Sequence, residues 1–276
     1  MSDDRGVWAY AITADAGDQD VSWLTGVADA TVRTAPAAGL TVLVSDVDLN
    51  EFGEAALRRN LEDLDWLEGV ARAHHEVIAV GSKLFPLLPT RLATVYSSDA
   101  SMAAVLGGRR DELLAALERV GGRVEWGVKA YAVPDSEQPE AMRHEPASAE
   151  GGAPAGAGGR GAGLSYLKRR KAQLSAQAES QRSAAAGAHA VHGHLCRRAA
   201  DARLHPPQSP QLSGDKRPMM LNAAYLVDAG DGTGFASEVA AAADAHPELD
   251  LNLTGPWPPY SFAGDEGQSP ARRDSG

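Results

Sequence analysis

The chain has 276 residues, 43% of them apolar, and a formal net charge of −11 with a pI near 5.2. Its length suffices for two domains of ordinary size, each with its own core. The acidic balance argues against nonspecific nucleic-acid binding by the whole chain, and a single cysteine, Cys196, excludes an intrachain disulfide or a cysteine-only metal cluster and suits a reducing compartment.

The N-terminus gives no sign of export or membrane insertion. Its first ten residues, MSDDRGVWAY, are acidic and lack the apolar centre of a signal peptide. No apolar stretch approaches the roughly 18 residues that span a bilayer. We therefore expect a cytoplasmic protein that does not bind membranes.

Residues 1–121 have the pattern of an α+β domain. Apolar, β-prone runs predict strands at 7–13, 40–45 and 92–96. Residues near 51–80 predict a helical stretch that ends at Gly81. Its apolar face comprises Leu61, Leu64, Leu67, Ala71, His74 and Ile78. Residues 99–120 predict a second helical region, broken near Gly107-Gly108 and ended by Gly121-Gly122.

Residues 122–262 predict a second domain with the order strand, helix, strand, strand, helix, strand. The strands are expected at 123–133, near 203–209, at 219–227 and at 249–254, and the helices at 164–203 and 235–246. This βαββαβ order is that of a ferredoxin-like domain. Residues 134–162, rich in Gly, Pro and Ala, predict a flexible insert, and residues 263–276 predict a disordered tail.

The long helix at 164–203 is expected to bury a stripe of apolar residues and to be basic at its start. The expected stripe comprises Leu164, Leu167, Leu174, Ala178, Ala185, Ala188, Val191, Leu195 and Ala199. Its first turns carry Lys168, Arg169, Arg170 and Lys171 in an otherwise acidic protein. Such a run forms either a solvated face or a surface that orients an acidic partner, and without interleaved aromatic residues it does not indicate nucleic-acid binding.

The segment after the last strand contains three aromatic residues among three prolines. Pro256, Pro258 and Pro259 predict that the strand stops at Pro256 and that the chain continues as a stiff, extended segment. Trp257, Tyr260 and Phe262 have two interpretations. They pin the C-terminal segment onto the core, or they form an exposed docking surface, because rigid aromatic side chains lose little entropy on binding.

The sequence contains no persuasive catalytic, metal or cofactor site. His74-His75 lacks a third metal ligand at helical spacing, and His189, His192, His194 and Cys196 lack a matching second group elsewhere. The glycine-rich run GAGGRGAG does not have the spacing of a phosphate-binding loop. Paired carboxylates such as Asp111-Glu112 fit exposed helix faces. We expect no enzyme and no cofactor.

Motifs along most of the chain resemble the GvpL/GvpF family of gas vesicle proteins. These are WAYAIT, NLEDLDWLEGVARAHHEVI, LLPTRLATVY, RRDELLAALERVGGRVEWGVKAYA, LSYLKRRKAQL, RPMMLNAAYLVD and LTGPWPPYSF. In the third motif Arg91 and Thr94 match an LP-x-RFGT-like pattern. Thr90, Leu92 and Ala93 depart from it and replace a bulkier apolar residue, Phe and Gly, respectively.

The resemblance implies a non-enzymatic accessory protein of gas vesicle assembly. Relatives are thought to bind the small, apolar shell protein and other accessory proteins, and retention as a minor vesicle component is compatible with this role. The family fold is two α+β domains, the second a modified ferredoxin-like one. The alternative is a small-ligand regulatory module or small oxygenase on a ferredoxin-like scaffold, which rests on analogy of fold alone.

Overall fold

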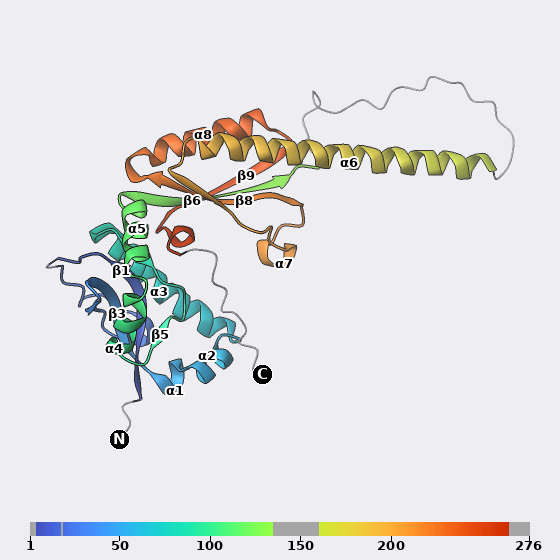
Figure 1. Cartoon of the computed structure of the whole chain (residues 1–276). Coiled ribbons are helices and arrows are strands. Elements are labelled where there is room, and N and C mark those ends of the chain that lie inside the picture. Colours follow the sequence, from blue (N-terminus) through green and yellow to red (C-terminus); the bar gives the residue numbers. More distant parts are fainter. Residues whose placement is uncertain (1–3, 18, 135–159, 265–276) are drawn as a thin grey trace. The chain divides into compact units, whose positions relative to one another are not determined.

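Two sheets organise the computed structural model, which describes residues 4–17, 19–134 and 160–264 (Figure 1). The described parts of 1–125 and 256–276 form a first unit, and those of 126–255 form a second. The sequence placed the boundary at 121 and assigned the terminal aromatic residues to the second domain, so the grouping differs at both points. Most of the predicted insert (134–162) and most of the predicted tail (263–276) lie outside the described residues.

The sheet of the first unit is built around a strand that is buried along nearly its whole length. This strand, β1 (Arg5–Thr13), lies between β3 (Leu40–Asp48) and the short strands β4 (Leu88–Pro89) and β5 (Val95–Tyr96), and β2 (Arg33–Ala37) extends the sheet beyond β3. The continuous apolar run at 7–13 reflects this position, because a strand covered on both faces has no solvent side. The sequence did not predict β2 or β4.

A tight turn joins β2 to β3. Ala38 and Gly39 both have positive φ, 54° and 77°. Two consecutive residues of this kind match the backbone of a type I′ hairpin turn, whose twist suits antiparallel strands. Gly39 adopts this conformation readily, whereas Ala38 does so at a cost.

The helices that accompany this sheet include α1 (Leu49–Phe52), α2 (Glu54–Asn60), α3 (Leu64–Leu84), α4 (Asp99–Gly107) and α5 (Arg110–Val120). The predicted break near Gly107-Gly108 is confirmed. The predicted face of the 51–80 region is wrong at its start, because the Asp63 carboxylate caps α3 and leaves Leu64 in its first turn, 77% exposed. Gly81 does not end the helix. It is buried within α3, where an added Cβ would lie 3.0 Å from methyl groups of Leu43 and Leu87.

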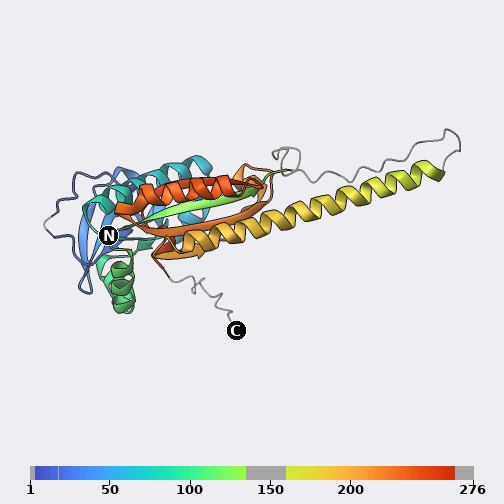
Figure 2. The same ribbon diagram turned by 90° about the horizontal axis from the view of Figure 1, so that it is seen from above.

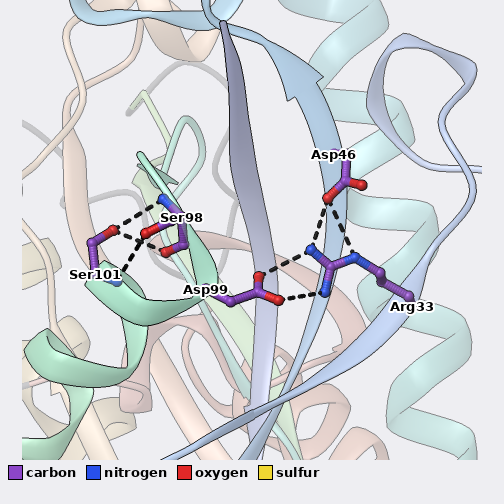
Figure 3. Close-up of polar contacts among 5 residues, drawn as sticks. All are labelled: Arg33, Asp46, Ser98, Asp99 and Ser101. Carbon is purple, nitrogen blue, oxygen red and sulfur yellow. Dashed lines mark hydrogen bonds and ion pairs between the residues drawn. The ribbon is translucent and has the colours of Figure 1, made fainter. Parts of the chain in front are cut away.

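Polar contacts fix the start of α4 against the sheet (Figure 3). Arg33 on β2 donates to both carboxylate oxygens of Asp99, at 3.0 and 2.9 Å, and to Asp46 on β3 at 2.7 Å. Ser98 and Ser101 form a capping box at the same helix end. Because this bidentate arrangement constrains orientation as well as distance, it holds α4 in one position beside β2.

The second unit has a four-stranded sheet with the order β7-β8-β6-β9. Its strands are β6 (Arg123–Ala132), β7 (Asp201–Leu204), β8 (Met219–Asp228) and β9 (Leu249–Trp257). Two helices, α6 (Arg160–Cys196) and α8 (Gly232–Ala245), lie side by side over one face (Figures 1 and 2). The core between them includes Val128, Leu195, Tyr225 and Phe235.

The stretch between β7 and β8 includes the short helix α7 (Pro210–Ser213) and contacts two strands by side-chain hydrogen bonds. Lys129 on β6 donates to Gln208 at 3.0 Å, and Asn222 on β8 donates to the Pro206 carbonyl at 2.9 Å. The Arg217 guanidinium lies 5.4 Å from the ring centre of Tyr131. Lys129 and Tyr131 belong to the side of β6 that the alternating pattern sets opposite the core, so part of that side is covered by this stretch.

The long helix α6 buries less of its length than the sequence predicted. Its buried residues include Ala184, Ala188, Val191 and Leu195, whereas Leu174 is 51% exposed and Ala185 is also exposed. Figures 1 and 2 show the N-terminal part of α6 extending beyond the strands of its own unit. The helix ends at Cys196 rather than near residue 203, because the following residues pair with β8 as strand β7.

The last strand, β9, does not stop at Pro256. It continues to Trp257. Because β9 lies at the edge of the four-stranded order, the missing N–H of Pro256 need not leave a carbonyl of a neighbouring strand unpaired. Gly255 has φ of 119°, a conformation that favours glycine, immediately before the chain enters the first unit.

Candidate functional site

The stretch 256–264, here the terminal aromatic segment, is anchored to the first unit at three points. Phe262 is fully buried. The backbone N–H and the hydroxyl of Ser261 both donate to the Glu125 carboxylate, at 2.7 Å each. The Arg119 guanidinium donates to the Phe262 carbonyl at 3.1 Å. These contacts restrain both the backbone and the direction of the side chains that remain outside.

Two aromatic rings of this segment remain partly exposed around His75 on α3. Tyr260 is 37% exposed and Trp257 is 43% exposed. The Tyr260 hydroxyl lies 2.8 Å from His75 Nδ1, and the two rings are stacked with centres 5.9 Å apart. Trp257 meets the same imidazole edge-on at 5.8 Å. Burial, followed by the negative charge of Glu125, raises the pKa of Tyr260, so its hydroxyl stays protonated at neutral pH.

The structure assigns different environments to the three aromatic residues that the sequence singled out together. Phe262 anchors the segment and offers no contact area in this conformation. Trp257 and Tyr260 present ring surface outward while His75 restrains them. The sequence offered two interpretations, anchoring of the segment on the core and exposure of an aromatic surface. The two are compatible in this structure.

The basic run Lys168 to Lys171 lies on the N-terminal part of α6, and all four of its residues are exposed. Leu174, one turn further on, adds exposed apolar surface. Within the described residues, no carboxylate forms an ion pair with this run. It belongs to the second unit, whereas the terminal aromatic segment belongs to the first.

A hollow of about 480 Å³ adjoins the terminal aromatic segment within the first unit. Tyr260 and Ser261 line one side of it, and Arg91 and Arg109 contribute cationic groups. Buried apolar side chains, including those of Leu88 and Leu113, contribute to its lining. The sequence analysis noted Arg91 as a motif residue but did not predict a cavity at this position.

His74 is buried in the core of the first unit and is not available as a ligand. Trp8 Nε1 donates to its Nδ1 at 3.0 Å, so the other ring nitrogen bears the hydrogen and faces the Thr90 carbonyl at 3.3 Å. Desolvation lowers the pKa of His74 to about 4, despite the opposing effect of the Thr90 carbonyl. The imidazole is therefore neutral at physiological pH.

The histidines near the end of α6 have structural partners. His192 Nδ1 lies 2.8 Å from the Tyr225 hydroxyl, and Cys196 Sγ lies 3.5 Å from His192 Nε2. His194 Nε2 lies 2.8 Å from Glu238 on α8, which Arg198 also contacts. In the portion of the chain that the structure covers, no three His, Cys, Asp or Glu side chains form a metal-binding group.

The residues that support this site were not predicted from the sequence. Glu125 occupies an outward position of an alternating strand, which indicates a solvated carboxylate, yet it is buried and binds Ser261. For His75, the sequence argued against a metal site but named no partner. Neither pairing has a local signal, because the partners are separated by 136 and 185 positions in the chain.

Comparison with known proteins gives relatives over nearly the whole length of the chain. The family model described as "Gas vesicle synthesis protein GvpL/GvpF" matches residues 6–264. Gas vesicle protein L of Streptomyces sp. (strain CB03234) is 39% identical over 265 residues, which cover 96% of this chain and 95% of that protein. Gas vesicle protein F of the same strain is 27% identical, with 84% and 87% covered.

Solved structures share the fold. The crystal structure of GvpF from Anabaena sp. PCC7120 matches with a TM-score of 0.62 and 19% identity, covering 95% of this chain and 97% of that one. GvpF from Microcystis aeruginosa matches with a TM-score of 0.61 and 17% identity, covering 94% and 99%.

Within the described ranges, no helix has both the length and the apolar character needed to cross a bilayer. The two sheets with their helices agree with the mixed α+β class expected from the sequence. The match to the family model and the similarity to gas vesicle protein L extend over both units, from the first strand to the terminal aromatic segment. The chain therefore belongs to the GvpL/GvpF family of gas vesicle synthesis proteins and has an accessory role in gas vesicles.

Proposed function

We propose that this chain binds the small apolar shell protein of gas vesicles, and other accessory proteins, to keep them soluble and to promote vesicle formation. Family membership supports the accessory role. An apolar shell subunit free in water aggregates through exposed surface and strand edges, so a protein that covers those surfaces delays aggregation. The proposed role needs no catalysis and no cofactor, and it allows the protein to remain in the vesicle as a minor component.

The second unit serves in this proposal as a modified ferredoxin-like scaffold. The strand order β7-β8-β6-β9, with α6 and α8 on one face, supports this description. Its modifications are the extended α6 and the residues between β6 and α6. Edge strands β7 and β9 offer backbone groups to which a strand of a partner could add.

The proposed contact surface is supported by two aromatic rings that are partly exposed and held in place. Glu125, Arg119 and buried Phe262 hold the terminal aromatic segment, while Trp257 and Tyr260 keep part of their rings exposed. Aromatic side chains held in this way bury a large area on binding at a small entropic cost. The exposed rings are therefore assigned to contact with the shell protein.

The basic run on α6 has a separate part in the proposal. Lys168, Arg169, Arg170 and Lys171 orient an acidic partner and increase its rate of association. Their position on an exposed stretch of helix supports this role, because the charges meet no carboxylate of the described residues.

The test is co-expression with the shell protein, followed by pull-down and sedimentation. Trp257→Ala removes an exposed ring that has no hydrogen bond among the described contacts, and Trp23→Ala is the matched control, because Trp23 is a 62% exposed tryptophan elsewhere on the first unit. We expect Trp257→Ala to reduce capture and solubility of the shell protein severalfold and Trp23→Ala to leave both unchanged. If the two changes have equal effects, Trp257 does not form the contact surface. If the unmodified chain does not capture the shell protein, the shell protein is not its partner.

The basic run is tested by replacing its four residues with glutamine. A control variant removes the same charge from exposed positions of the first unit, namely Arg58, Arg59, Arg72 and Lys83. We expect the association rate with an accessory protein, measured by surface plasmon resonance, to fall and to lose salt dependence only in the first variant. The same change in both variants would mean that net charge, not this run, is responsible.

A further inference from the structure

The hollow beside the terminal aromatic segment has an unusual lining for a chain with a net charge of −11. Arg91 and Arg109 both line it, and no described carboxylate does. We call this feature the arginine hollow. The lining is therefore positively charged in a negatively charged protein, which favours binding of an anionic group.

The two arginines are held differently. Arg109 bonds with Glu112 through Nε, at 3.0 Å, and through Nη2, which fixes its guanidinium and offsets part of its charge. Arg91 is exposed, and none of the described carboxylates forms an ion pair with it. Arg91 is therefore the group best placed to bind an incoming carboxylate, since a guanidinium can hold both carboxylate oxygens.

The rest of the lining is suited to an apolar group. Tyr96, Tyr260 and Ala263 line the hollow and are each at least partly exposed, whereas Leu88 and Leu113, which also line it, are buried. The volume of about 480 Å³ lies within the usual range of ligand-binding cavities. Cationic and apolar surfaces within one cavity match a ligand in which a carboxylate lies next to an apolar side chain.

The backbone that presents Arg91 has an uncommon conformation. Ala93, two residues further on, has φ of 61°, in the left-handed region that favours glycine. Thr90 Oγ1 donates to the carbonyls of Ala9 and Tyr10, at 2.6 and 3.0 Å, and ties the loop to β1. After Arg91, the Ala9 N–H donates to the Thr94 carbonyl at 2.9 Å, so the loop is tied to β1 on both sides of this arginine.

We propose that the arginine hollow binds an acidic segment of a partner protein, in which a carboxylate pairs with Arg91 and a neighbouring apolar side chain contacts the exposed parts of the Tyr96 and Tyr260 rings. The inference rests on the proposed function in assuming a protein partner. A protein segment is favoured over a free organic acid because Tyr260 lines the hollow and also belongs to the exposed aromatic surface, so one partner can contact both.

The experiment starts with a random library of 12-residue peptides displayed on phage and selected against the intact chain. We expect the selected peptides to be enriched in Asp or Glu next to Leu, Ile or Phe. A synthetic copy of a selected peptide is then compared, by fluorescence anisotropy, with a copy whose carboxylates are replaced by amides. The amide copy should bind at least tenfold more weakly, and binding of the acidic copy should weaken as salt is raised.

Site specificity is tested with matched charge changes. Arg91→Gln should weaken binding of the acidic peptide at least tenfold, and Arg91→Lys, which keeps the charge but loses the fork, should have an intermediate effect. Arg58→Gln is the control, because it removes the same charge from an exposed position of the same unit outside the hollow. We expect it to change affinity less than twofold. Circular dichroism and urea unfolding of each variant verify the fold.

Three results would overturn the proposal. These are selection without acidic enrichment, equal effects of Arg91→Gln and Arg58→Gln, and competition by octanoate at an affinity equal to that of the peptide, which would indicate a small-molecule site. Failure of this inference can be distinguished from failure of the proposed function. Normal capture of the shell protein with no peptide binding at Arg91 removes only this inference, whereas peptide binding at Arg91 without shell-protein capture removes only the shell protein as a partner.

Discussion

Glu125 and Ser261 are joined by two hydrogen bonds of 2.7 Å, one from the Ser261 backbone and one from its hydroxyl. The pair joins the beginning of β6 to the terminal aromatic segment, 136 positions later in the chain. Because a buried carboxylate needs hydrogen-bond donors, these two bonds help to satisfy Glu125. The first unit is therefore completed by residues from the end of the chain.

Glu125→Gln should loosen the terminal aromatic segment. The change removes the charge that strengthens both hydrogen bonds, and we expect a loss of about 1–3 kcal/mol in the free energy of unfolding. Ser261→Ala, which removes only the hydroxyl bond, should cost about 1 kcal/mol. Urea unfolding measures both losses, and limited proteolysis should show faster cleavage in 256–264 for Glu125→Gln. An unchanged cleavage rate would contradict the anchoring role.

His74 should make the first unit sensitive to acid. Its pKa of about 4 in the folded chain lies below the ordinary value of 6.5, so the unfolded chain binds more protons between these values. The contribution of this group to the free energy of unfolding is therefore fully present above pH 6.5. It falls by about 3 kcal/mol as the pH is lowered to 4. Urea unfolding from pH 7.5 to 4 measures the loss. His74→Gln, which cannot titrate, should have a shallower pH dependence, and an identical slope would refute the assignment.

Ala38→Asn should stabilise the β2–β3 hairpin. Ala38 is exposed and has φ of 54°, a conformation that asparagine tolerates better than alanine at this turn position. We expect a gain of up to about 1 kcal/mol in the free energy of unfolding. Gly39→Ala, with φ of 77° at the next position, should have the opposite sign. Thermal unfolding of the two variants provides the comparison, and a shift of both in the same direction would argue against a type I′ turn.

Two glycines of α6 should respond in opposite directions to alanine. A Cβ at Gly187 would overlap Glu248 Oε1 and approach His246, whereas a Cβ at Gly193 would meet nothing within 4 Å. Gly187→Ala should therefore destabilise the second unit by about 1–3 kcal/mol through overpacking. Gly193→Ala should stabilise it by up to about 1 kcal/mol through helix propensity. Chemical unfolding of the pair tests the close approach of α6 to Glu248, and a gain from both changes would exclude it.

Segments with strong local patterns were predicted well. The helices α5 and α8 and the strands β1, β6 and β8 have apolar periodicities that depend only on neighbouring residues, and each prediction lies within a few residues of the observed element. The strand β2, with the sequence RTAPA, has no such pattern. Its identity comes from pairing with β3 and from the contact of Arg33 with Asp99. Strand β4 likewise exists only through its pairing with β1.

The departure of Ala93 from the family pattern has a structural meaning that the motif alone did not give. The pattern has glycine there, and the φ of 61° explains why glycine suits the position. The sequence marked Arg91 as a matching residue, yet its place in a hollow with Arg109 and Tyr260 depends on three segments far apart in the chain. A local sequence pattern cannot predict that residues so far apart in the chain lie close together.

Short motifs and apolar periodicities were enough to identify the family, the mixed α+β class and, from residue 123 onward, the order of the four strands and the helices α6 and α8, because these depend only on neighbouring residues. Tertiary structure alone decided that Phe262 is buried while Trp257 and Tyr260 remain partly exposed, and that Glu125 and His75 contact the segment that carries them. This is because burial and hydrogen bonding depend on contacts between residues that are far apart in the chain. Three aromatic side chains within six residues are alike in sequence and differ only in what packs against them.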